Sequence, residues 1–505
     1  MKSIFFLALS LLIHTSLFSQ QLRFNWQKCI TNNLDETTHD IINAGNGYFL
    51  LVNQEQPEGV PNAGLVLIWL QKLAPSGQVL WEKYYGSSTG GGAGKILKDT
   101  ENSFYIMGAA VEGGGDVTYD PYPDSKDFWI IKIDSSGNKI WDKILGGIGY
   151  DQIEDIAVTT DGSIVIVGFI GSPDGNAGSY VGDASYYYGF WDFWVLKLDS
   201  DGNKVWDFTL GSPWIEYGIT ITATSDGGCI AGGSLHSEPG GNVECYDDGI
   251  QAVLVKLNMD GELEWQKCYG SSEVDQVDCI LETSDGFIIG AHTYFGDLDV
   301  EGAGYHLGYN HLGTTTSDIW IYKIDKNGNK IWGKCFGGSK DEAPDRLFQT
   351  SNGDIIVFGT TKSIDGDVTN NHHGFGQYED IWMIKLTGEG DLLWQRCIGT
   401  WGDQSIEKGV VMLDDYNFVV AANTVNGGVD DITCGVYPNY TTQYEDAWVF
   451  SITDSAGISG YRLSGTITNH QYQTLSQPRH RLYHPRNPCC VRYEAYAGRY
   501  NGCFG

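Results

Sequence analysis

Pairs of acidic residues recur along the chain and are the first candidates for chemistry. Five times an Asp, followed by Gln or Glu, precedes a second acid by a few residues. The pairs are Asp35 and Asp40, Asp151 and Asp155, Asp275 and Asp278, Asp341 and Asp345, and Asp403 and Glu407. Such oxygen ligands could hold Ca²⁺ or a cationic ligand. Their recurrence instead favours a structural role, in which each acid accepts hydrogen bonds from backbone N–H groups of a neighbouring unit.

Tyrosines gather in the long polar segments between predicted strands. A Tyr ring offers flat apolar area with a polar tip, which suits sugars and peptides. We therefore predict that these loops bind an extracellular glycan or protein, although the rings could equally serve to pack the loops down. The predicted ligand-binding residues are Tyr186, Tyr187, Tyr188, Tyr305, Tyr309, Tyr378, Tyr437 and Tyr440.

Two of these loops also carry closely spaced aspartates. Asp297 and Asp299 lie in FGDLDV, and Asp365 and Asp367 lie in SIDGDV. Because hard cations prefer oxygen ligands, we predict these four residues as a Ca²⁺ site, and we expect no other cofactor.

Two further motifs resemble metal sites but are better explained by local structure. DSDGN, which begins at Asp199, resembles the start of a calcium loop, but Leu210 stands where the twelfth-position acid is needed. His372 and His373 are adjacent, so on an extended segment their side chains would point apart.

No residue set in the sequence predicts a catalytic site. A nucleophile elbow, a phosphate-binding Gly loop and a Cys/His zinc spacing are all missing from the sequence. A catalytic site in a repeat protein should break the symmetry of the repeats, and the sequence shows no clear break. A polysaccharide hydrolase or lyase therefore stays the alternative to a binding protein.

The elements that must position these residues recur about every 60 residues. A strand of the form D-x-W-x-x-K-[IL] is followed by a short Gly-containing turn and a second strand centred on Trp. The Trp position of the first strand is held by Trp69, Trp129, Trp194, Val253, Trp320, Trp382 and Trp448. The second strand is centred on Trp26, Trp81, Trp141, Trp206, Trp265, Trp332 and Trp394.

Each repeat predicts four strands, and the two ends of the array complement each other. Trp26 belongs to a fourth strand with no other strands before it, whereas the last three strands, which end at Asp454, lack a fourth. We therefore predict an all-β fold: a seven-bladed β-propeller of four-stranded blades over residues 20–454, closed by the N-terminal strand as an outer strand. An open array would instead have atypical caps at both ends.

The net charge and the terminal segments predict the protein's partners and its localisation. Asp and Glu outnumber Lys and Arg by 64 to 31, a net charge of −33, which argues against nucleic acid and anionic membranes as partners. Residues 1–19 predict a signal peptide, and no other apolar run could span a membrane. We expect an exported monomer.

Residues 455–505 form an atypical tail with Arg and Cys. The tail could be a linker, a remnant sorting segment or a reading-frame artefact.

Four cysteines each follow a Trp by three residues, and we interpret them as small buried apolar side chains. They are Cys29, Cys268, Cys335 and Cys397. Cys245 and Cys434 lie in long loops and could pair, but spacing alone does not determine connectivity.

The repeat D-x-W-x-x-K-[IL]-D-x-x-G-N-x-x-W, with its TSDGG and TSNGD hairpins, resembles the secreted β-propeller-repeat proteins of the Bacteroidota. The resemblance covers roughly Trp26 to Asp454. It implies secretion and a binding role, without a known ligand or catalytic residues. Members often end in a type IX secretion sorting domain, which is not recognisable in YHPRNPCC or elsewhere in the tail.

Overall fold

The computed structural model describes most of the repeat region. The described residues are 22–30, 36–55, 66–100, 103–110, 113–121, 127–147, 151–171, 191–236, 240–244, 250–309, 313–372, 378–425, 431–434 and 446–454. Their regular secondary structure is β-strand, apart from one 3₁₀ turn at Leu298–Val300. No helix in these ranges is long and apolar enough to cross a bilayer.

The first three blades are four-stranded antiparallel sheets whose strands, a to d, follow the order of the chain. Blade 1 contains β2 (Glu36–Asn43), β3 (Tyr48–Glu55), β4 (Val66–Leu73) and β5 (Val79–Tyr85). Blade 2 contains β6 (Gly91–Thr100), β7 (Ser103–Ala110), β8 (Asp127–Asp134) and β9 (Lys139–Leu145). Blade 3 contains β10 (Gln152–Val158), β11 (Ile164–Ile170), β12 (Asp192–Leu198) and β13 (Lys204–Leu210).

The next three blades repeat this arrangement. Blade 4 contains β14 (Ile215–Ala223), β15 (Cys229–His236), β16 (Gln251–Leu257) and β17 (Leu263–Tyr269). Blade 5 contains β18 (Asp275–Thr283), β19 (Gly286–Thr293), β20 (Asp318–Asp325) and β21 (Lys330–Phe336). Blade 6 contains β22 (Glu342–Gln349), β23 (Ile355–Thr361), β24 (Asp380–Leu386) and β25 (Leu392–Ile398).

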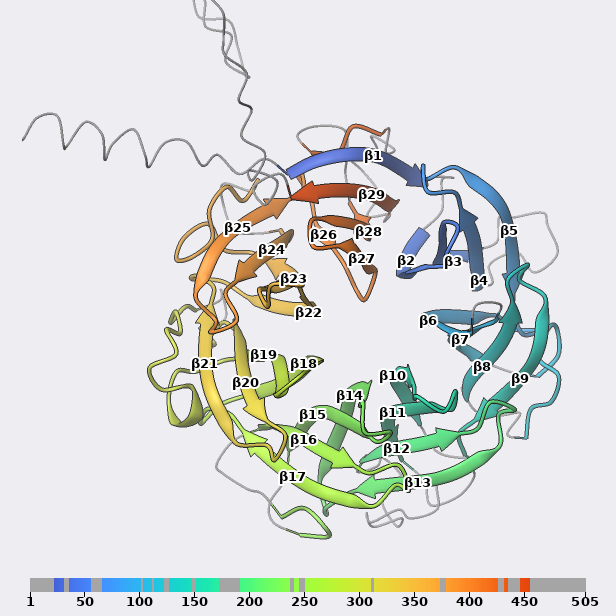
Figure 1. The fold of residues 1–505 in the computed structure, drawn as a ribbon, viewed down its shortest axis with the longest axis horizontal. Helices are drawn as coiled ribbons and strands as arrows, with labels where there is room; N and C mark the ends of the chain where they lie inside the picture. Colours follow the sequence, from blue (N-terminus) through green and yellow to red (C-terminus); the bar gives the residue numbers. More distant parts are fainter. Residues whose placement is uncertain are drawn as a thin grey trace, which may run out of the picture. The chain divides into compact units, whose positions relative to one another are not determined.

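Blade 7 joins the two ends of the propeller, as the sequence predicts. Its innermost strand is split into β26 (Gln404–Ser405) and β27 (Val410–Asp414), which both pair with β28 (Asn417–Thr424). β29 (Asp446–Asp454) follows, and β1 (Leu22–Ile30) pairs with it antiparallel, from Leu22 opposite Asp454 to Ile30 opposite Ala447. Figure 1 shows β1 (blue) outside β29 (red) in the ring. The predicted seven-bladed propeller and its closure by the N-terminal strand are therefore confirmed.

The repeated Trp of each d strand contacts the next blade, which explains why Trp and Gly recur together. A Cβ placed on Gly137, Gly202 or Gly261, in the hairpin before a d strand, would lie within 3.1 Å of the d-strand Trp of the preceding blade. These glycines have φ between +72° and +81°, a region that suits Gly. The same contact joins Trp26 of β1 to Gly77 of blade 1, at 2.7 Å. β1 thus behaves as a d strand toward its neighbour.

The buried apolar side chains form seven clusters, each shared by two adjacent blades. The c strands supply most of this core: β12 is buried along its whole length, and Trp194 within it is 1% exposed. The cluster between blades 7 and 1 includes Ile30 of β1. Burial on both faces of each sheet accounts for the nearly continuous apolar runs in the sequence.

A disulfide links β1 to blade 7, and it corrects the sequence-based view of the cysteines. Cys29 is bonded to Cys434, which lies in the loop between β28 and β29, with Cα atoms 5.5 Å apart. Cys268 is also disulfide-bonded. The prediction of free buried cysteines is therefore wrong for these two and confirmed for Cys335 and Cys397. The suggested pairing of Cys245 with Cys434 is wrong, because Cys434 has another partner.

We expect the combined Cys29→Ala and Cys434→Ala variant to lose about 2–4 kcal/mol of unfolding free energy, because the disulfide restricts the unfolded chain and holds the closing strand. Urea unfolding of the oxidised proteins measures this loss. Reduction should destabilise wild type more than the variant, because the variant has only the disulfide of Cys268 left to lose. Cys335→Ala is the control for cysteine removal without loss of a disulfide. A double variant as stable as oxidised wild type would contradict the expectation.

Candidate functional site

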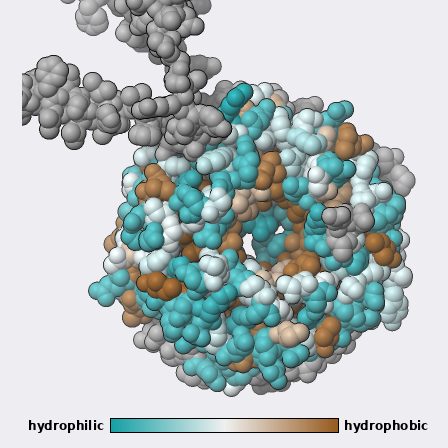
Figure 2. Space-filling view, viewed as in Figure 1, coloured by the Kyte–Doolittle hydropathy of each residue, from teal (hydrophilic) through white to brown (hydrophobic). Residues whose placement is uncertain are grey.

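The central channel is lined by the innermost strands, and six of them share a β-bulge at the same place. The bulge presents two successive residues instead of one. These pairs are His39 and Asp40, Gly94 and Lys95, Glu154 and Asp155, Ile219 and Thr220, Asp278 and Cys279, and Asp345 and Arg346. In blade 7 the break between β26 and β27 contains Glu407 and Lys408. Figure 2 shows the opening at the middle of the ring.

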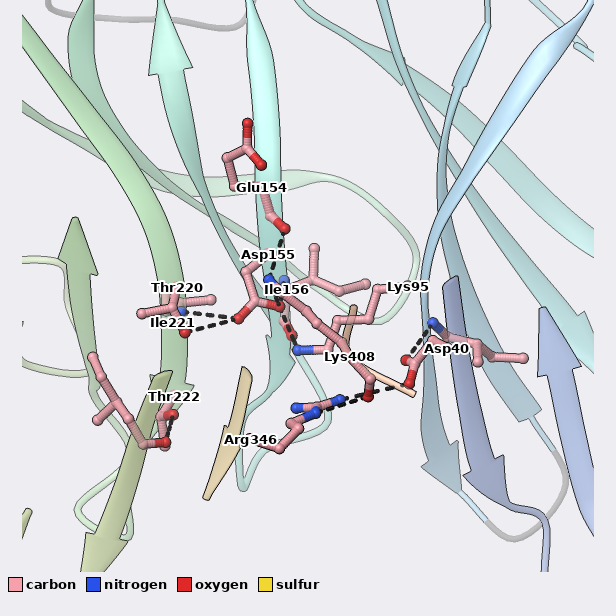
Figure 3. Close-up of polar contacts among 12 residues, drawn as sticks. Asp40, Lys95, Glu154, Asp155, Ile156, Thr220, Ile221, Thr222, Arg346 and Lys408 are labelled. Carbon is pink, nitrogen blue, oxygen red and sulfur yellow. Dashed lines mark hydrogen bonds and ion pairs between the residues drawn. The ribbon is translucent and has the colours of Figure 1, made fainter. Parts of the chain in front are cut away.

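Asp155 of blade 3 is the centre of a charge network in this channel (Figure 3). Its Oδ1 accepts a hydrogen bond from Lys95 Nζ of blade 2, and Lys408 Nζ of blade 7 lies 3.5 Å away. Its Oδ2 accepts from Thr220 Oγ1 at 3.2 Å and from the backbone N–H of Ile221 at 3.1 Å. Burial alone would raise the pKa of Asp155, but Lys408 and Lys95 outweigh it and hold the pKa well below its usual range.

Arg346 and Asp40 extend the network to blades 6 and 1. An Arg346 guanidinium nitrogen lies 3.5 Å from Asp40 Oδ1, and Arg346 Nε donates to the carbonyl of Lys408 at 2.8 Å. Asp40 Oδ2 accepts from the backbone N–H of Ile96 in blade 2 at 3.1 Å. Both Asp40 and Asp155 therefore bind a backbone N–H of the following blade. The structural interpretation of the recurring acids is confirmed at these two positions.

A second set of buried acids ties blades 4 to 6 to the loops before them. Asp275 Oδ2 accepts from the backbone N–H of Ser271 at 2.6 Å, and Glu342 Oε2 accepts from Gly338 at 3.0 Å. Glu216 makes the same contact with Ser212, at 3.1 Å. Burial raises the pKa of Asp275 to about 6, of Glu216 to about 7 and of Glu342 to about 8. Gln404, which carries no charge, takes this place in blade 7 and accepts from Thr400 N at 2.8 Å.

The b–c and d–a connections lie on one face of the ring, here called the loop face, and the a–b and c–d hairpins lie on the other, the hairpin face. On the loop face the b–c loops are held down by a recurring contact. The backbone N–H of Asp299 donates to Gly270, that of Asp367 to Gly337 and that of Asp431 to Gly399, at 3.1, 2.8 and 3.3 Å. Each contact anchors the described part of the b–c loop of blade 5, 6 or 7 to the ring.

The predicted Ca²⁺ ligands each have a local structural partner. Asp297 accepts from the backbone N–H of Ser272 at 2.8 Å, and Asp365 makes the equivalent contact with Ser339 in the next blade. The backbone N–H groups of Asp299 and Asp367 donate to the carbonyls of Gly270 and Gly337. The two aspartates therefore hold equivalent places in adjacent blades. Among the residues that the structure describes, no three His, Cys, Asp or Glu side chains are grouped to hold a metal. A Ca²⁺ site at these four aspartates stays a prediction.

Three of the predicted tyrosines are described, and they differ in role. Tyr305 is partly buried, and its hydroxyl lies 2.8 and 2.7 Å from the carbonyl oxygens of Tyr294 and Thr316, so it packs its loop down. Tyr309 and Tyr378 are 56% and 44% exposed on the loop face. Tyr186, Tyr187, Tyr188, Tyr437 and Tyr440 lie outside the described residues.

His372 packs against a buried acid. Its Nδ1 lies 2.7 Å from Asp380 Oδ2. His306 takes the equivalent place in blade 5, 3.0 Å from Asp318 Oδ2, and this hydrogen bond is the main reason why its pKa is raised. The histidine thus belongs to a repeated contact between a b–c loop and a c strand, and His373 lies outside the described residues.

Lys95, Arg346 and Lys408 were not predicted as functional residues from the sequence, although they break the symmetry of the repeats. Each is the basic residue at a position where another blade has an acid or a neutral residue. Alignment of the seven innermost strands on their bulge would have revealed them. The bulge itself carries no sequence signal, because its first residue ranges from Gly to Glu.

Comparison with known proteins gives only distant matches. No family model matches the chain. The regulatory protein FlaEY of Caulobacter vibrioides is 23% identical over 229 residues, so the match spans 43% of this chain and 24% of that protein. The WD40 domain of Neurospora crassa Pan2 gives a TM-score of 0.43 at 9% identity, over 82% of this chain and 88% of that one. A puromycin-hydrolyzing peptidase of Mycobacterium tuberculosis gives 0.42 at 9%, over 77% and 50%. Such distant likenesses carry no argument about function.

The pKa of Glu342 predicts how stability depends on pH. Its folded value of about 8 exceeds the unfolded value of about 4.3, so folding takes up a proton and stability falls as pH rises between these values. Glu342→Gln should remove this loss, because Gln404 shows that an amide fits the site. We expect the variant to gain about 2 kcal/mol over wild type at pH 8.5, and less at pH 5.

Urea unfolding at both pH values measures the effect of Glu342→Gln. Glu301→Gln, at an exposed loop residue, is the control for the loss of one negative charge. A Glu342→Gln variant whose stability falls with pH as steeply as that of wild type would show that this carboxyl is not the cause.

Proposed function

We propose that the protein is a secreted or cell-surface interaction protein that binds an extracellular protein or glycan on its loop face. The distribution of exposed aromatic side chains supports this most directly. Among the described residues, every large exposed aromatic side chain except Tyr84 lies on the loop face. On the hairpin side the exposed apolar side chains are mostly aliphatic: Met259 in a hairpin, and Leu80, Ile140, Val205, Leu263, Ile331, Leu392 and Leu393 at the start of the outer strands. The loop face carries eight large exposed apolar side chains, which are Tyr119, Trp214, Leu298, Leu307, Tyr309, Ile364, Tyr378 and Trp401. Aromatic and aliphatic side chains gathered on one face are typical of a binding surface.

Most of these side chains belong to adjacent blades. Leu298, Leu307 and Tyr309 are in the b–c loop of blade 5, and Ile364 is in that of blade 6. A shallow hollow of about 320 Å³ in the blade 5 loop is lined by Phe295, Tyr305 and Leu307, among others. Because aliphatic side chains accompany the aromatic ones, a polypeptide fits this surface better than a sugar.

The fixed loops and the disulfides support the same proposal. Loops held down by backbone hydrogen bonds lose little freedom on binding, which favours affinity. Disulfides persist in oxidising compartments, so the Cys29–Cys434 bond and the disulfide of Cys268 agree with export by the predicted signal peptide.

The proposal is tested with an array of extracellular proteins and glycans, probed with the mature protein in calcium and in chelator. Tyr309→Ala and Trp401→Ala should each weaken binding to the array hit by about 2 kcal/mol, because exposed aromatic residues often dominate such surfaces. Met259→Ala, on the hairpin face, is the matched control and should bind as wild type does.

Thermal unfolding of all three variants should be unchanged, since the three side chains are exposed. Binding that survives both loop-face substitutions but is lost in Met259→Ala would place the site on the hairpin face. Turnover of a polysaccharide without stable binding would favour the alternative, a hydrolase or lyase.

A further inference from the structure

Blades 5 and 6 place two acids beside the open space of the channel. The cavity there, of about 250 Å³, is lined by three acids, Asp155, Asp278 and Asp345, and by three bases, Lys95, Arg346 and Lys408. The bases are directed at groups other than Asp278 and Asp345. Lys95 and Lys408 contact Asp155, Lys408 also donates to the Glu154 carbonyl, and Arg346 contacts Asp40 and the Lys408 carbonyl. The basic side chains of the channel thus pair with acids of blades 1 and 3.

Among the described acids on this side of the channel, Asp345 is the one that lacks a partner. Its Oδ2 is buried, and no hydrogen bond or ion pair to it is found among the described residues. The other acids are satisfied. Asp278 Oδ2 lies 2.8 Å from His292 Nδ1, and Glu407 Oε2 lies 2.5 Å from His39 Nδ1. Glu379, in the loop before β24, pairs with Lys362 at 2.9 Å. A buried carboxyl without a partner is costly, which points to a group that the bound state supplies.

We propose that this cavity binds an alkylammonium group, which donates a hydrogen bond to the Asp345 carboxylate. A metal ion is disfavoured, since no three ligating side chains are grouped among the described residues. An ammonium is compact and has three donors, whereas a guanidinium prefers a carboxylate whose two oxygens are both accessible. The group could belong to a free polyamine or to a Lys side chain of a bound polypeptide.

The electrostatics of Asp345 make this binding depend on pH. Burial raises its pKa well above the usual range, Asp278, Glu379 and Glu407 raise it further, and only Arg346 opposes them. Lys408, which lines the same cavity, is paired with Asp155, and the neighbouring acids Asp278 and Glu407 are paired with His292 and His39. A bound ammonium favours the ionised carboxylate and therefore opposes these effects on the pKa of Asp345. Affinity should rise with pH while the ligand itself stays charged, below about pH 10.

The raised pKa of Asp345 also predicts that its ionised carboxylate does not stabilise the fold. A carboxyl whose folded pKa exceeds its unfolded value lowers stability as pH rises above the unfolded value. Asp345→Asn should therefore keep or raise the melting temperature at pH 8. A residue kept for structure would show the opposite, so this measurement separates a binding role from a structural one.

Calorimetric titration of the full-length wild-type protein with cadaverine tests the proposal, and Nα-acetyl-lysine methylamide tests the side-chain source. We expect binding of at least one amine, none of neutral 1,5-pentanediol, and affinity that rises from pH 6 to pH 8.5. Asp345→Asn should weaken binding by about tenfold or more, in line with the loss of a charged hydrogen bond. Asp260→Asn, which removes one negative charge from a hairpin, should leave binding unchanged.

Binding of cadaverine alone would identify a polyamine site, and binding of the lysine derivative would identify a site for a protein side chain. Equal binding by wild type and Asp345→Asn would overturn the proposal, because it would reflect general attraction to a chain with a net charge of −33. Wild-type affinity that does not rise with pH would also overturn it, without reliance on any variant.

Discussion

The pairing of β1 with β29 is the interaction on which the rest of the structure depends. It joins residues more than 400 positions apart, and without it blade 7 would expose the edge of β29. Gln27 of β1 strengthens the join: its amide donates to the carbonyl of Asp431 and its Oε1 lies 3.3 Å from Trp448 Nε1. Gln395 makes the equivalent contact with Trp382 in blade 6. Closure fixes the distance between blades 7 and 1, and hence the channel and the loop face.

The channel shows how a closed ring accommodates buried charge. Lys95, Asp155 and Lys408 come from blades 2, 3 and 7, so their contacts exist only in the assembled ring. Buried ion pairs seldom add net stability, but the removal of one partner is costly. The network therefore favours one arrangement of the blades over others. The split innermost strand of blade 7 makes it possible, since the break is where Lys408 turns toward blade 3.

The fold could be predicted from the sequence because every blade meets the same packing demand. The recurring Trp and Gly positions are consequences of one contact between adjacent blades, and the surplus strand at Trp26 matches the missing strand after Asp454. The channel could not be predicted this way, because the bulge that presents Lys95 and Arg346 leaves no trace in the apolar pattern. Cys29 could have been assigned its partner once closure was accepted, since β1 lies beside the blade 7 loop that contains Cys434. The partial burial of Tyr305 could not be predicted, because burial cannot be read from a loop sequence.

Hydrogen exchange of the backbone amides, followed by mass spectrometry after reduction of the disulfides, tests closure most directly. If β1 is part of blade 7, the amides of Leu22–Ile30 should exchange as slowly as those of Asp446–Asp454, because the two strands open together. Fast exchange throughout Leu22–Ile30, with Asp446–Asp454 still protected, would show that the N-terminal strand does not close the ring and would contradict the account.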